Sequence, residues 1–92
     1  MTASIDQRVH VGEDVMFREL DGEAVLLNLE SGRYYGLDPV GSRIWQFVQE
    51  TPLLRSVWQS MQDEFDAPAD TLHKDLLAFI DELSGEGLVT LH

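Results

Sequence analysis

The side chains that could carry out chemistry are scattered along this chain and form no reactive set. His10, His73 and His92 are far apart and share no spacing typical of zinc ligands. No serine lies in a nucleophile-elbow pattern, and the glycines form no phosphate-binding loop. We therefore expect no catalytic residues, no metal site and no cofactor, and we expect that the protein is not an enzyme.

Two dipeptides that favour tight turns predict a three-stranded antiparallel meander. Asp21-Gly22 and Ser31-Gly32 each lie between strand-like runs, and such dipeptides favour two-residue hairpin loops because glycine accepts a positive φ. The residues that face each other across the two loops are then Leu20 with Glu23 and Glu30 with Arg33.

The main chain of the last strand is the strongest candidate for function. This strand contains Arg33, Tyr34, Tyr35, Gly36 and Leu37, and no later segment is an obvious partner for it. An edge strand leaves N–H and C=O groups unpaired, so it can bind another chain. Apolar side chains fall on both faces of the sheet, and a face without cover is available to a partner.

Three helices are predicted after the sheet. Asp38-Pro39 combines a capping carboxylate with proline at the first helical position, and this helix should run to about Glu50. Thr51-Pro52 repeats the start signal, and the break at 66–68 precedes a third helix that ends near Ser84. A sheet followed by helices indicates an α+β fold, similar to a winged helix-turn-helix.

The third helix has more apolar surface than one core-facing stripe needs. Leu72, Leu76, Phe79 and Leu83 form one stripe, whereas Leu77 lies about 140° from Leu72 on a helical wheel. Leu77 is either an ordinary exposed leucine or part of a second apolar face. In the second case, the groove beside the edge strand would suit an extended peptide. The groove side would contain His73, Leu77, Ile80 and Ser84.

Composition limits the classes of partner and compartment. The 92 residues form one domain, with 17 acidic and 6 basic side chains and a net charge of −11. Nonspecific nucleic-acid affinity comes from neutralised phosphates, so this charge argues against a nucleic-acid partner. No apolar run is long enough for a membrane span, and no signal peptide or cysteine is present, so we expect a cytoplasmic protein. Residues 1–12 are expected to be a flexible arm.

The pattern GEAVLLNLESGRYYGLDPVGSRIW, followed by two helices that end in DLLAFIDELSGEGLV, resembles the PqqD-like family. These small domains are also called RiPP precursor-peptide recognition elements. The resemblance covers the chain from about Val15 to Val89, so residues 13–92 are expected to form the recognition domain. The segment RYYGLD is most similar to the standalone proteins of lasso-peptide clusters.

The resemblance implies a non-catalytic adaptor that binds the leader of a ribosomally made precursor peptide as an added strand. The guest would lie against residues 33–37, in the groove beside the third helix. In lasso systems the implied partner is a transglutaminase-like cysteine protease that removes the leader, and a separate cyclase is a further candidate partner. Two alternatives remain: a peptide carrier for pyrroloquinoline quinone or another radical-enzyme pathway, and a winged-helix DNA-binding regulator.

Overall fold

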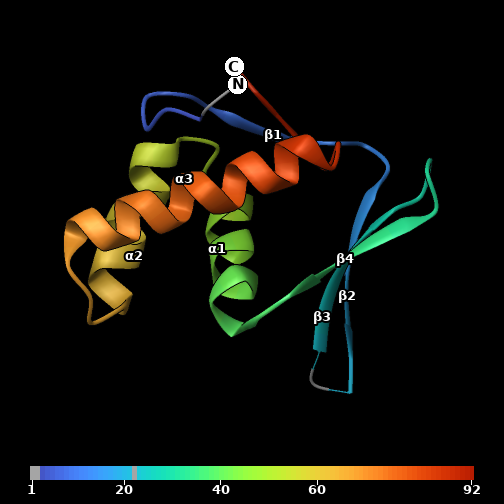
Figure 1. Cartoon of the computed structure of the whole chain (residues 1–92), viewed down its shortest axis with the longest axis horizontal. Coiled ribbons are helices and arrows are strands. Elements are labelled where there is room, and N and C mark those ends of the chain that lie inside the picture. The colour runs from blue at the N-terminus through green and yellow to red at the C-terminus, as the bar shows by residue number, and fades with distance from the viewer. Residues whose placement is uncertain (1–2, 22) are drawn as a thin grey trace.

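The computed structural model describes residues 3–21 and 23–92. A three-stranded sheet lies beside a group of three helices (Figure 1). A second, two-stranded sheet is formed by residues near the two chain ends. In chain order, the described elements are β1 (Val9–Val11), β2 (Val15–Leu20), β3 (Glu23–Asn28), β4 (Arg33–Leu37), α1 (Pro39–Glu50), α2 (Leu54–Glu64), α3 (Ala69–Gly85) and β5 (Val89–Leu91). The expected α+β fold, with a three-stranded antiparallel sheet followed by three helices, is confirmed.

The first hairpin has the predicted register. The sheet order is β2-β3-β4, and Leu20 faces Glu23 across a two-residue loop. Asp21 has a positive φ of 53°, a conformation that short polar residues tolerate in tight turns. Gly22, the other loop residue of the prediction, lies outside the described residues.

The second hairpin is longer than predicted, and the expected pair of Glu30 with Arg33 is wrong. Asn28 faces Arg33 instead, which leaves a four-residue loop. The Asn28 side chain explains the difference, because its Oδ1 accepts the N–H groups of Glu30 at 3.0 Å and Ser31 at 3.2 Å. Gly32 completes the turn with a φ of 75°. A local asparagine turn therefore replaces the two-residue loop.

The helix starts agree with their signals to different degrees. At α1, Asp38 Oδ1 accepts the Gly41 N–H at 2.6 Å and Pro39 is the first helical residue, as predicted. Helix α2 begins at Leu54, two residues beyond Pro52. The Pro52 carbonyl instead accepts the Val9 N–H at 2.8 Å, so this segment pairs with the N-terminal residues.

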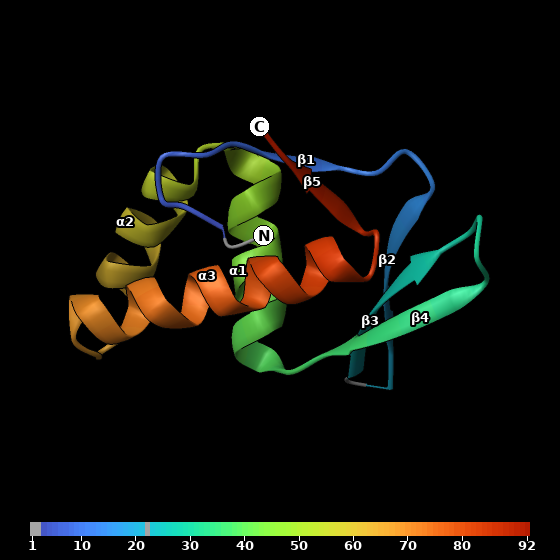
Figure 2. The ribbon, with the colours of Figure 1, turned by 45° about the horizontal axis from the view of Figure 1, so that its top comes forward.

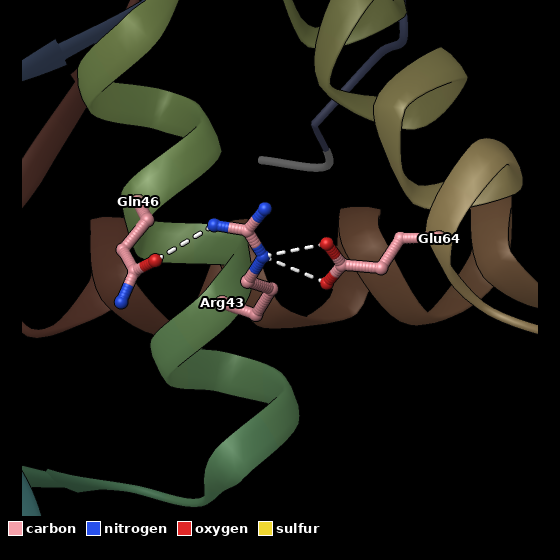
Figure 3. A network of polar contacts seen from close by, with 3 residues as sticks. All are labelled: Arg43, Gln46 and Glu64. Carbon is pink, nitrogen blue, oxygen red and sulfur yellow. Dashed lines mark hydrogen bonds and ion pairs between the residues drawn. The ribbon is translucent and has the colours of Figure 1, made fainter.

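A polar network joins the first two helices (Figure 3). Arg43 Nε donates to both carboxylate oxygens of Glu64, at 2.8 and 2.7 Å, and Arg43 Nη1 donates to Gln46 at 2.7 Å. The Arg43 guanidinium also lies 4.3 Å from the centre of the Phe47 ring. The hydrogen bond to Arg43 lowers the pKa of Glu64 and raises the pKa of Arg43. This exposed network bridges α1 and α2 at the surface.

The N-terminal segment differs from the flexible arm expected over residues 1–12. Strand β1 pairs antiparallel with β5, and Val9 faces Leu91. Ala3 and Val9 are buried in the core, and the Ala3 N–H donates to Asp81 Oδ1 of α3 at 2.6 Å. The described N-terminal residues therefore cover part of α3, which has consequences for the site.

One core lies between the inner face of the sheet and the helices. Leu26 from β3, Ile44 from α1 and Leu76 from α3 are essentially inaccessible to solvent. The inner sheet face carries Phe17, Leu26 and Tyr35, which lie side by side in register, while the outer face leaves Tyr34 74% exposed. None of the described helices is long and apolar enough to cross a membrane.

Candidate functional site: the open edge of β4 and the cleft beside α3

Strand β4 is paired on one side only. Its partner is β3, and no other strand among residues 3–21 and 23–92 pairs with it. The other edge of the sheet is β2, which likewise pairs only with β3 among those residues. The sheet therefore has two edges, and what lies beside each one decides which can accept a guest chain.

The register identifies which main-chain groups of β4 are free. In an antiparallel sheet, successive residues of a central strand bond alternately to its two neighbours. The two-residue loop makes Glu23 bond toward β2, and the Leu29 N–H donates to Asp14 on that same side at 2.8 Å. Leu26 therefore bonds to Tyr35, which lies opposite it in β4.

The free groups of β4 consequently belong to Tyr34 and Gly36. Their N–H and C=O groups point away from β3, toward the side where no described strand lies. Gly36 is exposed, and a Cβ added there would meet nothing within 4 Å. Among the described residues the edge is therefore unpaired, and the sheet face above Gly36 is open.

A cleft of about 260 Å³ lies between this strand and α3. Helix α3 runs across the molecule, and its C-terminal end approaches the sheet that contains β4 (Figure 2). One wall comes from the end of β4 and the other from one flank of α3. The lining residues are Tyr35, Gly36, Leu37, Asp38, Asp75, Ala78, Phe79 and Glu82.

Close packing of α1 against α3 positions the apolar part of this cleft. A Cβ added at Gly41 would lie 3.2 Å from the Phe79 ring and 3.1 Å from Asp38 Oδ1. Glycine at this buried position lets the start of α1 approach Phe79 while Asp38 still caps the helix. Phe79 is thereby held beside Leu37, and both line the cleft.

Tyr35 connects the strand to the helix across the cleft. Its hydroxyl donates a hydrogen bond to Glu82 Oε2. That hydrogen bond, together with partial burial and the negative charge of Glu82, raises the pKa of Tyr35 to about 12. The phenol therefore stays protonated at neutral pH, so Tyr35 holds the open edge against α3 as a neutral donor.

The cleft is negatively charged. Asp38, Asp75 and Glu82 line it, and none of the described lysine, arginine or histidine side chains does so. Within the described part of the chain, ion pairs join Arg43 to Glu64 and Arg55 to Asp6. No basic side chain there forms an ion pair with the three cleft carboxylates.

The structure brings the predicted strand residues together but separates the predicted helix residues from them. Arg33, Tyr34, Tyr35, Gly36 and Leu37 form β4 as expected. His73, Leu77, Ile80 and Ser84 do not line the cleft beside β4. Whether either set binds a peptide stays a prediction, and the four helix residues lie away from the cleft beside β4.

Each of the four helix residues has another position. Ile80 is 0% exposed and belongs to the core. The His73 ring packs edge-on against Trp58 of α2, with ring centres 4.9 Å apart. Leu77 is half-buried against the core, and the Ser84 carbonyl accepts the Gly87 N–H at 3.1 Å where α3 ends.

The helical wheel selected the flank of α3 that lies away from the cleft beside β4. Relative to Leu76, the residues His73, Leu77 and Ser84 lie about 60–100° to one side. The cleft residues Asp75, Phe79 and Glu82 lie about 60–120° to the other side. The apolar character of Leu77 favoured the first flank, yet the N-terminal segment bonds to that side through Asp81.

The cleft residues Asp75, Ala78, Phe79 and Glu82 were therefore missed by sequence reasoning. Phe79 was assigned to the core stripe, and exposed carboxylates on a helix are usually solvated. The one sequence signal for this cleft was that β4 leads directly into α1 at Asp38, which lines the cleft. Which flank of α3 meets that strand depends on how the helices pack, and local sequence patterns do not encode this.

Comparisons with known proteins identify the family and the fold. The family model for coenzyme PQQ synthesis protein D (PqqD) matches residues 23–89, more than half of the chain. No curated protein matches this chain. A solved structure of TbiB1 in complex with the TbiA(beta) leader peptide is 33% identical, with a TM-score of 0.79; the match covers 86% of this chain and 92% of that one. Lasso peptide synthetase B1 complexed with the leader peptide shares the fold at 21% identity, with a TM-score of 0.78 and coverage of 90% and 98%.

Proposed function

Because this chain belongs to the PqqD family, we propose that it is a non-catalytic adaptor that binds the leader segment of a ribosomally synthesised precursor peptide. The leader would add a strand to the sheet along β4, between that strand and α3. The observation that carries the proposal is the open main chain of Tyr34 and Gly36 beside a formed cleft. Strand addition to an exposed edge is a recurring mode of peptide recognition.

The size of the site suits a moderate affinity. A micromolar dissociation constant corresponds to about −8 kcal/mol. Hydrogen bonds to the free groups of Tyr34 and Gly36 would contribute roughly 0.5–1.5 kcal/mol each. Burial of guest side chains against Phe79 and Leu37 would supply the apolar part at about 25 cal/mol per Å². An adaptor must also release the leader, so extreme affinity is not required.

We place this adaptor in lasso-peptide maturation. The support is the 33% identity to TbiB1 over most of both chains, together with the fold shared with lasso peptide synthetase B1. In this proposal the bound leader is presented to a transglutaminase-like cysteine protease, which removes it, and a separate cyclase closes the ring. Binding along β4 would leave the outer sheet face, where Tyr34 is exposed, accessible to such a partner.

The second candidate function is that of a peptide carrier for pyrroloquinoline quinone or another radical-enzyme pathway. The specific observation in its favour is that the matching family model is the PqqD model itself. Titration with the two kinds of leader separates these candidates: a lasso precursor leader should bind, and a precursor from the quinone pathway should not. The reverse preference would favour the carrier.

A DNA-binding regulator fits the observations less well. The net charge of −11 repels phosphate, and carboxylates line the cleft beside the sheet. A gel-shift assay at low salt tests this candidate. Duplex binding with a steep salt dependence would favour the regulator over the adaptor.

Substitutions of Gly36 test strand addition directly. Gly36→Pro removes an outward N–H, whereas Gly36→Ala keeps it and adds a Cβ into open space. With the leader of a precursor encoded beside this gene, calorimetry should show affinity about tenfold lower for Gly36→Pro and nearly unchanged for Gly36→Ala.

The control for the edge is Glu19→Pro, which removes the corresponding outward N–H of β2. In the β2–β3 register, Glu19 lies between residues that bond to β3. Its N–H therefore points away from β3, outward from the β2 edge of the sheet. This variant should bind the leader like the wild type. Full affinity in a folded Gly36→Pro protein, or loss of binding in Glu19→Pro alone, would contradict addition along β4.

A further inference from the structure

The proposed function leaves open which leader sequences this site prefers, and the charge of the cleft bears on that question. An added strand would place alternate side chains toward α3, on the same sheet face as Tyr35 and Leu37. On that face it would meet Asp75, Phe79 and Glu82, which project from the flank of α3 that lines the cleft. The order along the helix is therefore acidic, aromatic, acidic.

Helix and strand spacing match over this stretch. Glu82 lies seven positions after Asp75, which corresponds to a rise of about 10.5 Å along a helix. Four residues of an extended guest span about 13 Å. The flexible stem of a lysine or arginine can cover the remaining difference. Three consecutive inward positions of a guest strand would thus oppose the two carboxylates and the ring between them.

The charges of the cleft favour basic guest side chains at the two outer positions. Asp38, which lines the cleft near Phe79, adds a third negative charge, although its Oδ1 already accepts the Gly41 N–H. Within residues 3–21 and 23–92, no lysine, arginine or histidine forms an ion pair with Asp75 or Glu82. A basic guest residue would therefore supply a charge partner that this chain itself does not provide.

At the start of β4, an acidic residue at the end of α3 lies beside a basic residue of the strand. Glu86 lies with Arg33 and Tyr35 around a small hollow where β4 begins. A basic residue of the chain is already present there, so the requirement for guest cations is restricted to the stretch between Asp75 and Glu82.

We propose that the site selects leader segments with the pattern basic-x-apolar-x-basic, in which the three specified residues face α3. The basic residues would pair with Asp75 and Glu82, and the apolar residue would pack on Phe79. The pattern reads the same in both chain directions, so it holds for a parallel or an antiparallel guest. This inference rests on the proposed function, because it specifies the chemistry of the peptide that β4 binds.

Selection from a random twelve-residue peptide library displayed on messenger RNA tests the proposal with the full chain as bait. Wild-type protein should enrich peptides with lysine or arginine at positions i and i+4 and an apolar residue at i+2. An Asp75→Asn, Glu82→Gln double variant should lose the basic preference. The matched control is Glu50→Gln with Asp63→Asn, which removes the same charge from exposed positions on α1 and α2 and should keep the preference.

The outcomes separate this inference from the function beneath it. An enriched basic-patterned peptide should bind the double variant about tenfold more weakly than the wild type, and added salt should reduce that difference. Enrichment of peptides whose binding requires the Gly36 N–H but which lack the basic pattern would overturn the inference and leave the proposed function standing. If no peptide is enriched, the proposed function and the inference both fail.

Discussion

The two flanks of α3 have opposite surroundings and opposite chemistry. The flank with Leu77 and Asp81 faces the N-terminal segment, and the Ala3 N–H donates to Asp81. The flank with Phe79 and Glu82 faces β4 across an open cleft. The flank with Leu77 is the covered one, and the open flank carries Asp75, Glu82 and one aromatic ring.

If the leader binds along β4 as proposed, apolar character alone does not mark the binding surface of this small domain. A chain of 92 residues has little core to spare, so it uses an extra apolar side chain such as Leu77 for its own packing. The surface that stays open combines a backbone edge with charges and one ring. Affinity would then come from backbone pairing, and selectivity from Asp75, Phe79 and Glu82.

Truncation of one apolar residue on each flank should give the largest difference in leader binding. Phe79→Ala removes the apolar part of the cleft and should weaken leader binding about tenfold, as for a central contact of an interface. Leu77→Ala should leave leader binding unchanged while it lowers the free energy of unfolding by about 1–2 kcal/mol, since Leu77 is half-buried. Calorimetric titration and urea unfolding measure the two quantities. Weaker binding in Leu77→Ala than in Phe79→Ala would assign the peptide to the other flank.

A neighbouring pair of carboxylates gives a smaller contrast. Asp81→Ala removes the acceptor of the Ala3 N–H and should cost about 1 kcal/mol of stability without a change in leader affinity. Glu82→Ala should instead lower the affinity about two- to fivefold for a leader with basic residues, with a stability change within about 0.5 kcal/mol. Thermal unfolding and titration of both variants provide the comparison. If the two substitutions behave alike, the flanks are not functionally distinct.

The smallest effect concerns the Tyr35 hydroxyl. Its hydrogen bond to Glu82 raises the pKa of Tyr35 to about 12, above the ordinary value of 10.0. Because the folded state favours the protonated phenol, this stabilisation is complete below about pH 10 and is lost as the pH rises through about 12. Tyrosinate absorbance of a Tyr34→Phe protein should therefore report a pKa near 12, and Glu82→Gln should lower it. An unchanged titration after that substitution would show that Glu82 does not hold the phenol.

Local signals were sufficient for much of the fold. The cap formed by Asp38 and the two-residue first loop were correctly predicted because each depends on residues adjacent in sequence. The identity of β4 as an edge strand followed from the lack of a later strand-like segment. The second loop differs from the prediction because the Asn28 side chain accepts the N–H groups of the turn, which a dipeptide signal does not reveal.

The features that sequence reasoning missed depend on contacts between distant residues. Strand β1 has only three residues, and it is defined by pairing with β5 some eighty positions later. The contact of Ala3 with Asp81 likewise joins residues that are 78 positions apart. Helical periodicity placed Phe79 in the core stripe and does not encode which flank of α3 such contacts cover.

Amide hydrogen exchange with and without bound leader tests the central claim most directly. If a guest strand adds along β4, the Tyr34 and Gly36 amides should become strongly protected, because their N–H groups point to the open side. The Phe17 and Glu19 amides on the opposite edge of the sheet should exchange at unchanged rates. New protection at Phe17 and Glu19, with none at Tyr34 and Gly36, would contradict the account.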